Sequence, residues 1–96
     1  MNSSKVFKLA EGIHNNNKAA FEALYQIWWD KAYQNAYGYL LNPEDAEDAA
    51  QEVFAEIWEN RKKLDPFSFT SWFAQRVNTV CAGKALNLNS AGDLAV

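Results

Sequence analysis

Apolar residues recur at helical spacing from residue 18 to residue 41, and this long repeat limits the possible folds more than any other pattern in the chain. An apolar side chain at every third or fourth position, kept up for almost seven turns, is typical of an amphipathic helix with one buried stripe. The stripe consists of Phe21, Leu24, Tyr25, Trp28, Ala32, Ala36 and Leu40. No segment alternates as a strand does, so the pattern predicts an all-α fold. Trp29 and Tyr33 fall off the stripe and either pack on a neighbouring element or form a contact surface that pairs two copies.

Three further segments have helical period. A short helix is predicted at residues 5–11, with Ser4 as its N-cap and Gly12 as its end. Asn42 followed by Pro43 predicts the start of a helix over residues 43–59. A last helix is predicted to begin at Ser68 or Thr70 and to run to about Leu86. The expected architecture is a compact bundle of about four helices.

A chain of 96 residues is the size of one domain. Residues 1–86 are predicted to form it, and residues 87–96 to be a linker stub or a disordered tail. An apolar fraction of 49% excludes a chain that is disordered throughout.

No apolar run reaches the roughly 20 residues that span a bilayer, and the N-terminus lacks the order of a secretory signal, so a cytoplasmic location is expected. Cys81 is the only cysteine and is predicted to be a buried thiol without a disulfide or metal role.

Charge is divided between neighbouring segments. Residues 43–59 hold seven acids and no base, whereas residues 60–86 hold five bases and one acid. The local charges are therefore −7 and +4, although the whole chain has a net charge of only −3. This asymmetry predicts two different partners on two faces.

Residues suited to catalysis are scarce. His14 is the only histidine, lies among asparagines, and suits a surface or capping role. Ser68 and Ser71 lack a nucleophile elbow and a nearby base, and they are interpreted as helix-start residues. The acids of residues 44–52 lack both the Glu-x-x-His pairs of helical di-metal sites and the glycine of a calcium loop. No enzyme activity, metal or cofactor is predicted.

Two surfaces remain as candidate binding sites. The acidic helix is either a solvated face or a docking surface for a basic partner, and composition does not decide between the two. The basic loop and last helix combine cations with aromatic rings, as proteins that bind single-stranded DNA do, although most of those rings also suit the core. This set is Arg61, Lys62, Lys63, Phe67, Phe69, Trp72, Phe73, Gln75, Arg76, Asn78 and Lys84.

Residues 42–58 closely resemble the DPEDAEDLVQEVFLRLW pattern of extracytoplasmic-function sigma factors, of the sigma-70 family. Residues 68–79 resemble that family's SFRAWLYRIARN segment, and residues 21–25 match its F..LY opening. The two long motifs occur in the family's order and at its spacing. The resemblance is to region 2, the helical domain that binds core RNA polymerase and recognises and melts the promoter −10 element.

The resemblance implies a role for each surface. The acidic helix would dock on the clamp coiled coil of the largest polymerase subunit. Its implied contacts are Asp48, Gln51, Glu52, Phe54 and Trp58. The loop and last helix would bind the non-template strand of the −10 element, with one base flipped into a pocket of the loop. The implied DNA contacts are Arg61, Lys62, Lys63, Phe67, Trp72, Gln75, Arg76, Asn78 and Lys84.

The chain also departs from the family pattern. Past Asn78 the family has an Asp and several bases, whereas this chain has only Lys84, so weak backbone affinity for DNA is expected. The family's second domain, which reads the −35 element, has no counterpart in these residues, as expected for a piece of a longer protein or for a short protein that does not select promoters in the usual way. The alternative interpretation is a protein-interaction module that binds the clamp or an anti-sigma factor without effective DNA binding.

Overall fold

The computed structural model is built from helices. It describes the backbone of residues 3–95 and the side chains of residues 4–86. The elements are α1 (Ser3–His14), α2 (Lys18–Leu40), α3 (Pro43–Glu59), the single 3₁₀ turn η1 (Arg61–Lys63) and α4 (Phe69–Ala95). In this part of the chain no strand forms, which confirms the predicted all-α bundle of about four helices.

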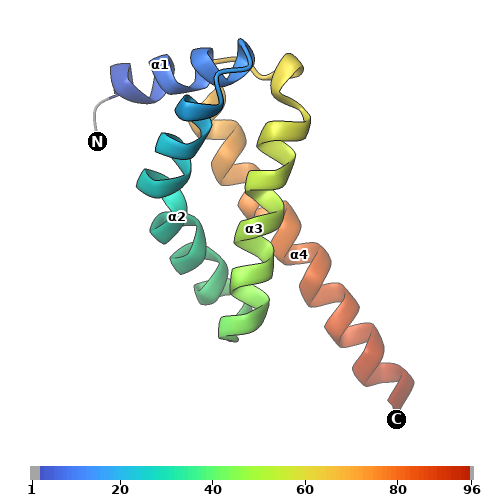
Figure 1. Ribbon diagram of the computed structural model, residues 1–96. Coiled ribbons are helices and arrows are strands. Elements are labelled where there is room, and N and C mark those ends of the chain that lie inside the picture. The colour runs from blue at the N-terminus through green and yellow to red at the C-terminus, as the bar shows by residue number, and fades with distance from the viewer. Residues whose placement is uncertain (1–2, 96) are drawn as a thin grey trace.

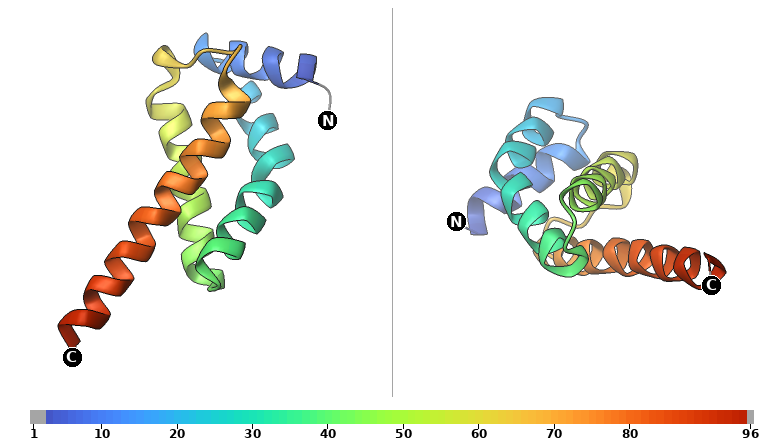
Figure 2. Two further views of the ribbon diagram at one scale, coloured as in Figure 1. Left: turned by 180° about the vertical axis from the view of Figure 1, so that it is seen from behind. Right: turned by 90° about the horizontal axis from the view of Figure 1, so that it is seen from below.

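α2 and α3 form a hairpin, and the other two helices, α1 and α4, lie across it (Figure 1). α2 and α3 run antiparallel side by side, and α4 passes diagonally across them on one side, as the view from behind shows (Figure 2). α1 lies across the end of the bundle where α3 gives way to η1 and α4 begins (Figure 1). The end of α3, the turn that follows it and the start of α4 therefore lie together beside α1.

Side-chain caps define the starts of α2 and α3. The Asn17 side chain accepts a hydrogen bond from the backbone N–H of Ala20 at 3.2 Å, and Asn42 accepts one from Asp45 at 3.0 Å. These are N-cap bonds that satisfy backbone donors otherwise left free in the first turn. The hairpin turn itself is only Leu41 and Asn42, and Leu41 adopts the left-handed conformation at φ 56° that closes α2.

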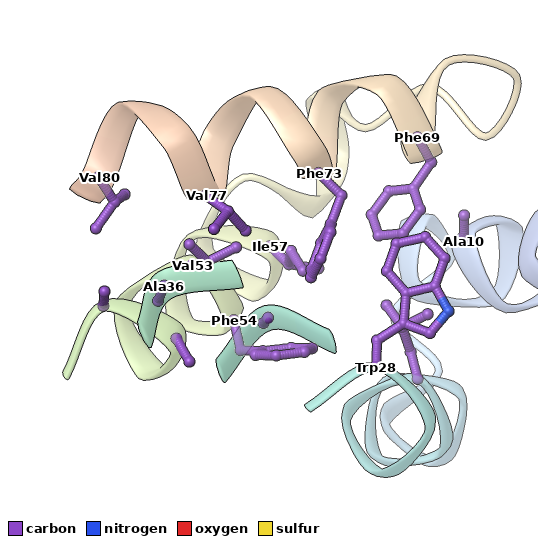
Figure 3. Close-up of a cluster of buried hydrophobic side chains, with 14 of the residues drawn as sticks. Ala10, Trp28, Ala36, Val53, Phe54, Ile57, Phe69, Phe73, Val77 and Val80 are labelled. Atoms are coloured by element: carbon purple, nitrogen blue, oxygen red, sulfur yellow. The ribbon is translucent and has the colours of Figure 1, made fainter. Parts of the chain in front are cut away.

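The core is centred on aromatic rings from three helices (Figure 3). The Trp28 ring centroid lies 4.5 Å from that of Phe73 and 5.5 Å from that of Phe69, and Phe54 lies 5.7 Å from Phe73. Small side chains line the hairpin and allow its two backbones to approach. These are the buried alanines Ala32, Ala36, Ala46, Ala49 and Ala50. Among residues 4–86 no polar or charged residue is buried, so the core is held by apolar packing.

The ring of Trp29 is half-buried on the α3 side of α2. It stacks on Tyr25 at 5.2 Å and lies 6.1 Å from Phe54. Tyr33 is also half-buried and stacks on Tyr37 at 6.2 Å. Packing within the chain thus accounts for both off-stripe rings, and pairing of two copies through them stays a prediction.

The structure corrects the predicted limits of α1. The helix covers residues 3–14 instead of 5–11, so Ser4 lies inside it and does not cap it. Gly12 does not end the helix but lies where α1 meets α2. A Cβ atom at Gly12 would come within 2.8 Å of the Ala20 Cβ, so this glycine permits the close approach of the two helices.

α4 begins at Phe69, between the two predicted starts, but it does not end near Leu86. It continues to Ala95, and its last turns project beyond the hairpin (Figures 1 and 2). Extending a helix is far easier than nucleating one, and residues 87–95 contain no proline to stop it. The side chains of this extension and the whole of Val96 lie outside the described residues, and the predicted domain boundary at residue 86 stays a prediction.

Candidate functional site

The outward surface of α3 is acidic. Residues spaced three or four apart on this helix share one face, and all members of the outward set are exposed. We call this set the acidic face. It consists of Glu44, Asp48, Gln51, Glu52, Ala55 and Glu59. The opposite side of α3 holds the buried residues, so the helix separates core contacts from a negatively charged surface.

The structure brings three of the predicted docking residues together on the acidic face. Asp48, Gln51 and Glu52 are exposed within little more than one turn. The Gln51 side-chain amide donates to the Glu47 carboxylate at 3.3 Å. Trp58 lies two turns beyond Gln51 at the edge of this surface, half-buried. Its ring packs on Phe21 at 5.3 Å.

Phe54 is not part of that surface. It is only 1% exposed, and its ring lies 4.7 Å from Tyr25 in addition to its contacts with Phe73 and Trp29. The helical repeat places residue 54 on the side of α3 that packs into the hairpin. The structure therefore corrects the prediction for Phe54, which supports the core and is not available to a partner.

Residues 60–68 form a basic turn between α3 and α4. Lys62 and Lys63 are exposed, and η1 keeps them next to each other at the end of the bundle. The Asp65 carboxylate accepts a hydrogen bond from the Phe67 N–H at 3.0 Å, which closes the second half of the turn. Phe67 is 87% exposed, although its ring meets that of Phe7 on α1 edge-on at 4.8 Å.

A cavity of about 110 Å³ opens beside the basic turn. Its apolar walls come from the end of α3, the turn and the start of α4, and its polar groups come from the turn. The lining residues are Ile57, Asn60, Lys63, Leu64, Asp65, Ser68, Phe69 and Trp72. An indole wall beside amide, hydroxyl, carboxylate and ammonium groups suits a flat ring with hydrogen-bonding edges.

The two bases of α4 face α3 and are paired there. Arg76 donates two hydrogen bonds to the Glu56 carboxylate, at 2.5 Å and 2.7 Å. These bonds are the main cause of a raised Arg76 pKa, which desolvation opposes. Lys84 lies 3.7 Å from Glu52. The cations of α4 therefore do not extend the basic turn.

The remaining predicted DNA contacts fall in two places. Trp72 lines the cavity together with Lys63. Gln75 and Asn78 are exposed on the outer side of α4, away from the core residues of that helix. The outer side of α4 thus offers uncharged polar groups instead of a row of cations.

Sequence reasoning missed part of this site. Asn60, Leu64 and Ser68 line the cavity, and His14 and Asn16 contact Arg61 in the basic turn. The contacts of His14 and Asn16 with Arg61 join residues at least 45 positions apart, and helical period carries no signal for such pairs. Only the run of cations at residues 61–63, which lies between Asn60 and Ser68, marked the segment.

The described residues contain no group of three or more potential metal ligands. They also contain no helix that is both long and apolar enough to cross a membrane.

The structure is an antiparallel helical hairpin with an acidic outer face, followed by a basic turn and a crossing helix. The sigma-70 region 2 family model matches residues 24–82, more than half of the chain, and the chain belongs to that family. Searches of curated proteins and of solved structures returned no match. Region 2 takes part in RNA polymerase binding and promoter melting, and the family is one of non-enzymatic initiation factors.

Proposed function

We propose that the chain is region 2 of an extracytoplasmic-function sigma factor that works in the cytoplasm. It docks through the acidic face on the clamp coiled coil of the largest polymerase subunit, and it holds an unpaired base of the −10 non-template strand in the cavity beside the basic turn. The observation that carries the proposal is the separation of the two surfaces: no residue of the acidic face lines the cavity. One domain can therefore bind both partners at once.

The acidic face supports docking on a basic coiled coil. α3 is 17 residues long, which corresponds to about 25 Å of helix, and it carries no base along that length. Opposite charge on the partner would speed the encounter, and the neutral amide of Gln51 would add a directional contact. Trp58 at the edge provides apolar area of the kind that anchors interfaces.

Binding to an isolated clamp coiled coil tests this docking surface. Gln51→Ala and Glu52→Lys are expected to weaken binding about tenfold or more, because interface contacts of this type contribute about 1–3 kcal/mol. Glu22→Lys makes the same charge reversal on an exposed residue of α2 and serves as the matched control. Equal binding by all three folded variants would contradict the assignment of the acidic face.

The cavity and the basic turn support binding of single-stranded DNA. A base fits the cavity only after it has left the duplex, so binding favours the melted state by its differential affinity. Lys63 lines the cavity and Lys62 is its exposed neighbour, so the two ammonium groups would supply positive charge for the phosphates next to such a base. DNA opening then needs no bond cleavage.

Binding of single-stranded and duplex −10 DNA across a salt series tests this second surface. The single strand is expected to bind more tightly. Replacing Lys62 and Lys63 by Gln is expected to weaken that binding and to reduce the salt slope by about 0.7 for each lost phosphate contact. Replacing the exposed Lys5 and Lys18 by Gln is the matched control. Equal affinity of the wild-type chain for both DNA forms would exclude a melting role.

One observation favours the alternative function of a protein-interaction module that binds the clamp or an anti-sigma factor. Arg76 and Lys84 are engaged with acids of α3, so the cations left at the cavity are those of the basic turn. The same salt series separates the two functions, because a module without DNA contact would show no salt-dependent affinity at all.

A further inference from the structure

We infer that Arg61 is a positioning residue which locks the basic turn onto the connector between α1 and α2, and that it is not itself a phosphate contact. The inference rests on the proposed DNA-binding function of the turn. It concerns a contact between residues 14–16 and residues 61–62, of which the first group lies outside the matched family segment.

The guanidinium of Arg61 is already occupied on three sides. Its Nε donates to the Asn16 side-chain oxygen at 2.8 Å, and its Nη1 donates to the Trp58 carbonyl at 2.7 Å. The guanidinium also lies over the Trp58 ring, 4.2 Å from the centroid. A planar fork of donors that also stacks on a ring is a geometry that lysine does not reproduce.

The connector is shaped to make these contacts. Asn16 has a left-handed backbone at φ 67°, a conformation that asparagine adopts more readily than most residues. The Asn17 N–H donates to the Gly12 carbonyl at 2.8 Å, which holds the turn at the end of α1. Asn16 can thus present its side chain to Arg61.

His14 makes a second bridge to the same residue. Its Nδ1 lies 3.1 Å from the Arg61 carbonyl oxygen, and because a carbonyl only accepts, Nδ1 carries the hydrogen and donates it. The Lys62 ammonium reaches the His14 carbonyl at 3.5 Å, a long contact that leaves Lys62 exposed. The backbone of Arg61 is therefore held by His14, the last residue of α1, and its side chain by Asn16 in the connector.

The turn also contacts α1 at its other end, where the largely exposed ring of Phe67 meets the ring of Phe7 edge-on. Between these anchors Lys62 and Lys63 have no ion-pair partner among the described residues. The connector and α1 therefore determine where the two lysines and the cavity rim lie, and Arg61 transmits that placement.

Hydrogen exchange tests the positioning role in the 96-residue chain without DNA. Asn16→Gly keeps the left-handed backbone but removes the acceptor, and Arg61→Lys keeps the charge but removes the fork. Both are expected to speed exchange of the Lys63 and Leu64 amides, which are bonded within the turn, about fivefold or more, as loss of a charge-assisted hydrogen bond implies. Asn16→Asp keeps both backbone preference and acceptor and is expected to restore slow exchange. Asn15→Ala, at the exposed neighbouring position, is the control. Unchanged exchange in both loss variants would overturn the inference.

The salt dependence of single-stranded DNA binding separates positioning from phosphate contact. Asn16→Gly and Arg61→Lys are expected to weaken binding about fivefold while the salt slope stays unchanged, because neither removes a charge. If Arg61 bound phosphate directly, Arg61→Lys would keep nearly full affinity and Asn16→Gly would have no effect, and the inference would be wrong. Failure of the wild-type chain to bind DNA would instead count against the proposed function, because the exchange result does not depend on DNA.

Discussion

Arg76 on α4 and Glu56 on α3 form a two-bond pair in which Nε and Nη2 of the guanidinium each donate to a different carboxylate oxygen. The side chains are 36% and 20% exposed, so the pair lies at the edge of the core and not in open solvent. It joins the helix of the acidic face to the helix that bears the cavity wall Trp72. We interpret Arg76 as a strut between the two functional surfaces.

The strut has a measurable contribution to stability. Glu56→Gln and Arg76→Gln are each expected to lower the free energy of unfolding by about 1 kcal/mol, as partly exposed bidentate pairs do. A double-mutant cycle in urea should give a coupling of about 0.5–1 kcal/mol between the two residues. Glu59→Gln, on the exposed side of the same helix, is the control. A coupling near zero would show that the pair is not a strut.

The burial of Phe54 predicts a large difference between two phenylalanines. Phe54→Ala removes a ring from the centre of the core and is expected to cost about 3–5 kcal/mol. Phe67→Ala removes a mostly exposed ring and is expected to cost less than about 1 kcal/mol. Chemical denaturation measures both. Similar losses for the two variants would contradict the placement of Phe54 in the core.

Two glycines in helices should respond to alanine in opposite directions. At Gly83 nothing lies within 4 Å of an added Cβ, so Gly83→Ala should stabilise the chain by up to about 1 kcal/mol through helix propensity. At Gly12 the added Cβ meets Ala20, so Gly12→Ala should destabilise it by about 1–3 kcal/mol in spite of that propensity. Thermal unfolding of the two variants checks the signs. Stabilisation by both would mean that α1 does not pack closely on α2.

Cys81 predicts how stability changes at high pH. The thiol is buried, and desolvation raises its pKa above the ordinary value of 9.0, against a smaller opposite effect of Lys84. The thiol therefore ionises more readily in the unfolded chain, so its contribution to stability is complete below about pH 9 and is lost as the pH rises above it. Cys81→Ala should make unfolding less dependent on pH in this range, measured by urea denaturation at pH 7 and pH 10. The same pH dependence in both chains would exclude the thiol as its source.

The sequence predicted those helix starts that have a local capping signal. Asn42 and Pro43 lie where α3 starts, because a cap is a short-range interaction that the sequence displays directly. The end of α4 was missed because its last residues have no apolar period and also no proline. A helix that is already formed can extend through such a segment.

Helical period predicts which residues of α3 are exposed, whereas contacts between distant segments depend on long-range packing. The exposure of Asp48, Gln51 and Glu52 follows from the helical repeat. Phe54 was assigned to the docking surface from the family resemblance, although the helical repeat places it on the apolar side of α3 that packs into the hairpin. Arg76 was predicted as a DNA contact from the resemblance, and its pairing with Glu56 was not foreseen, because the two residues lie 20 positions apart and sequence patterns carry no pairing information at that distance.

The proposed function requires two separate binding surfaces on one small bundle, and mapping of amide chemical shifts tests this requirement most directly. Isotope-labelled chain would be titrated first with the clamp coiled coil and then with single-stranded −10 DNA. The coiled coil is expected to shift amides on the outer side of residues 44–59, and the DNA those of residues 60–72, with both sets present in the ternary mixture. Shifts by both ligands over the same residues, or displacement of one ligand by the other, would contradict the account.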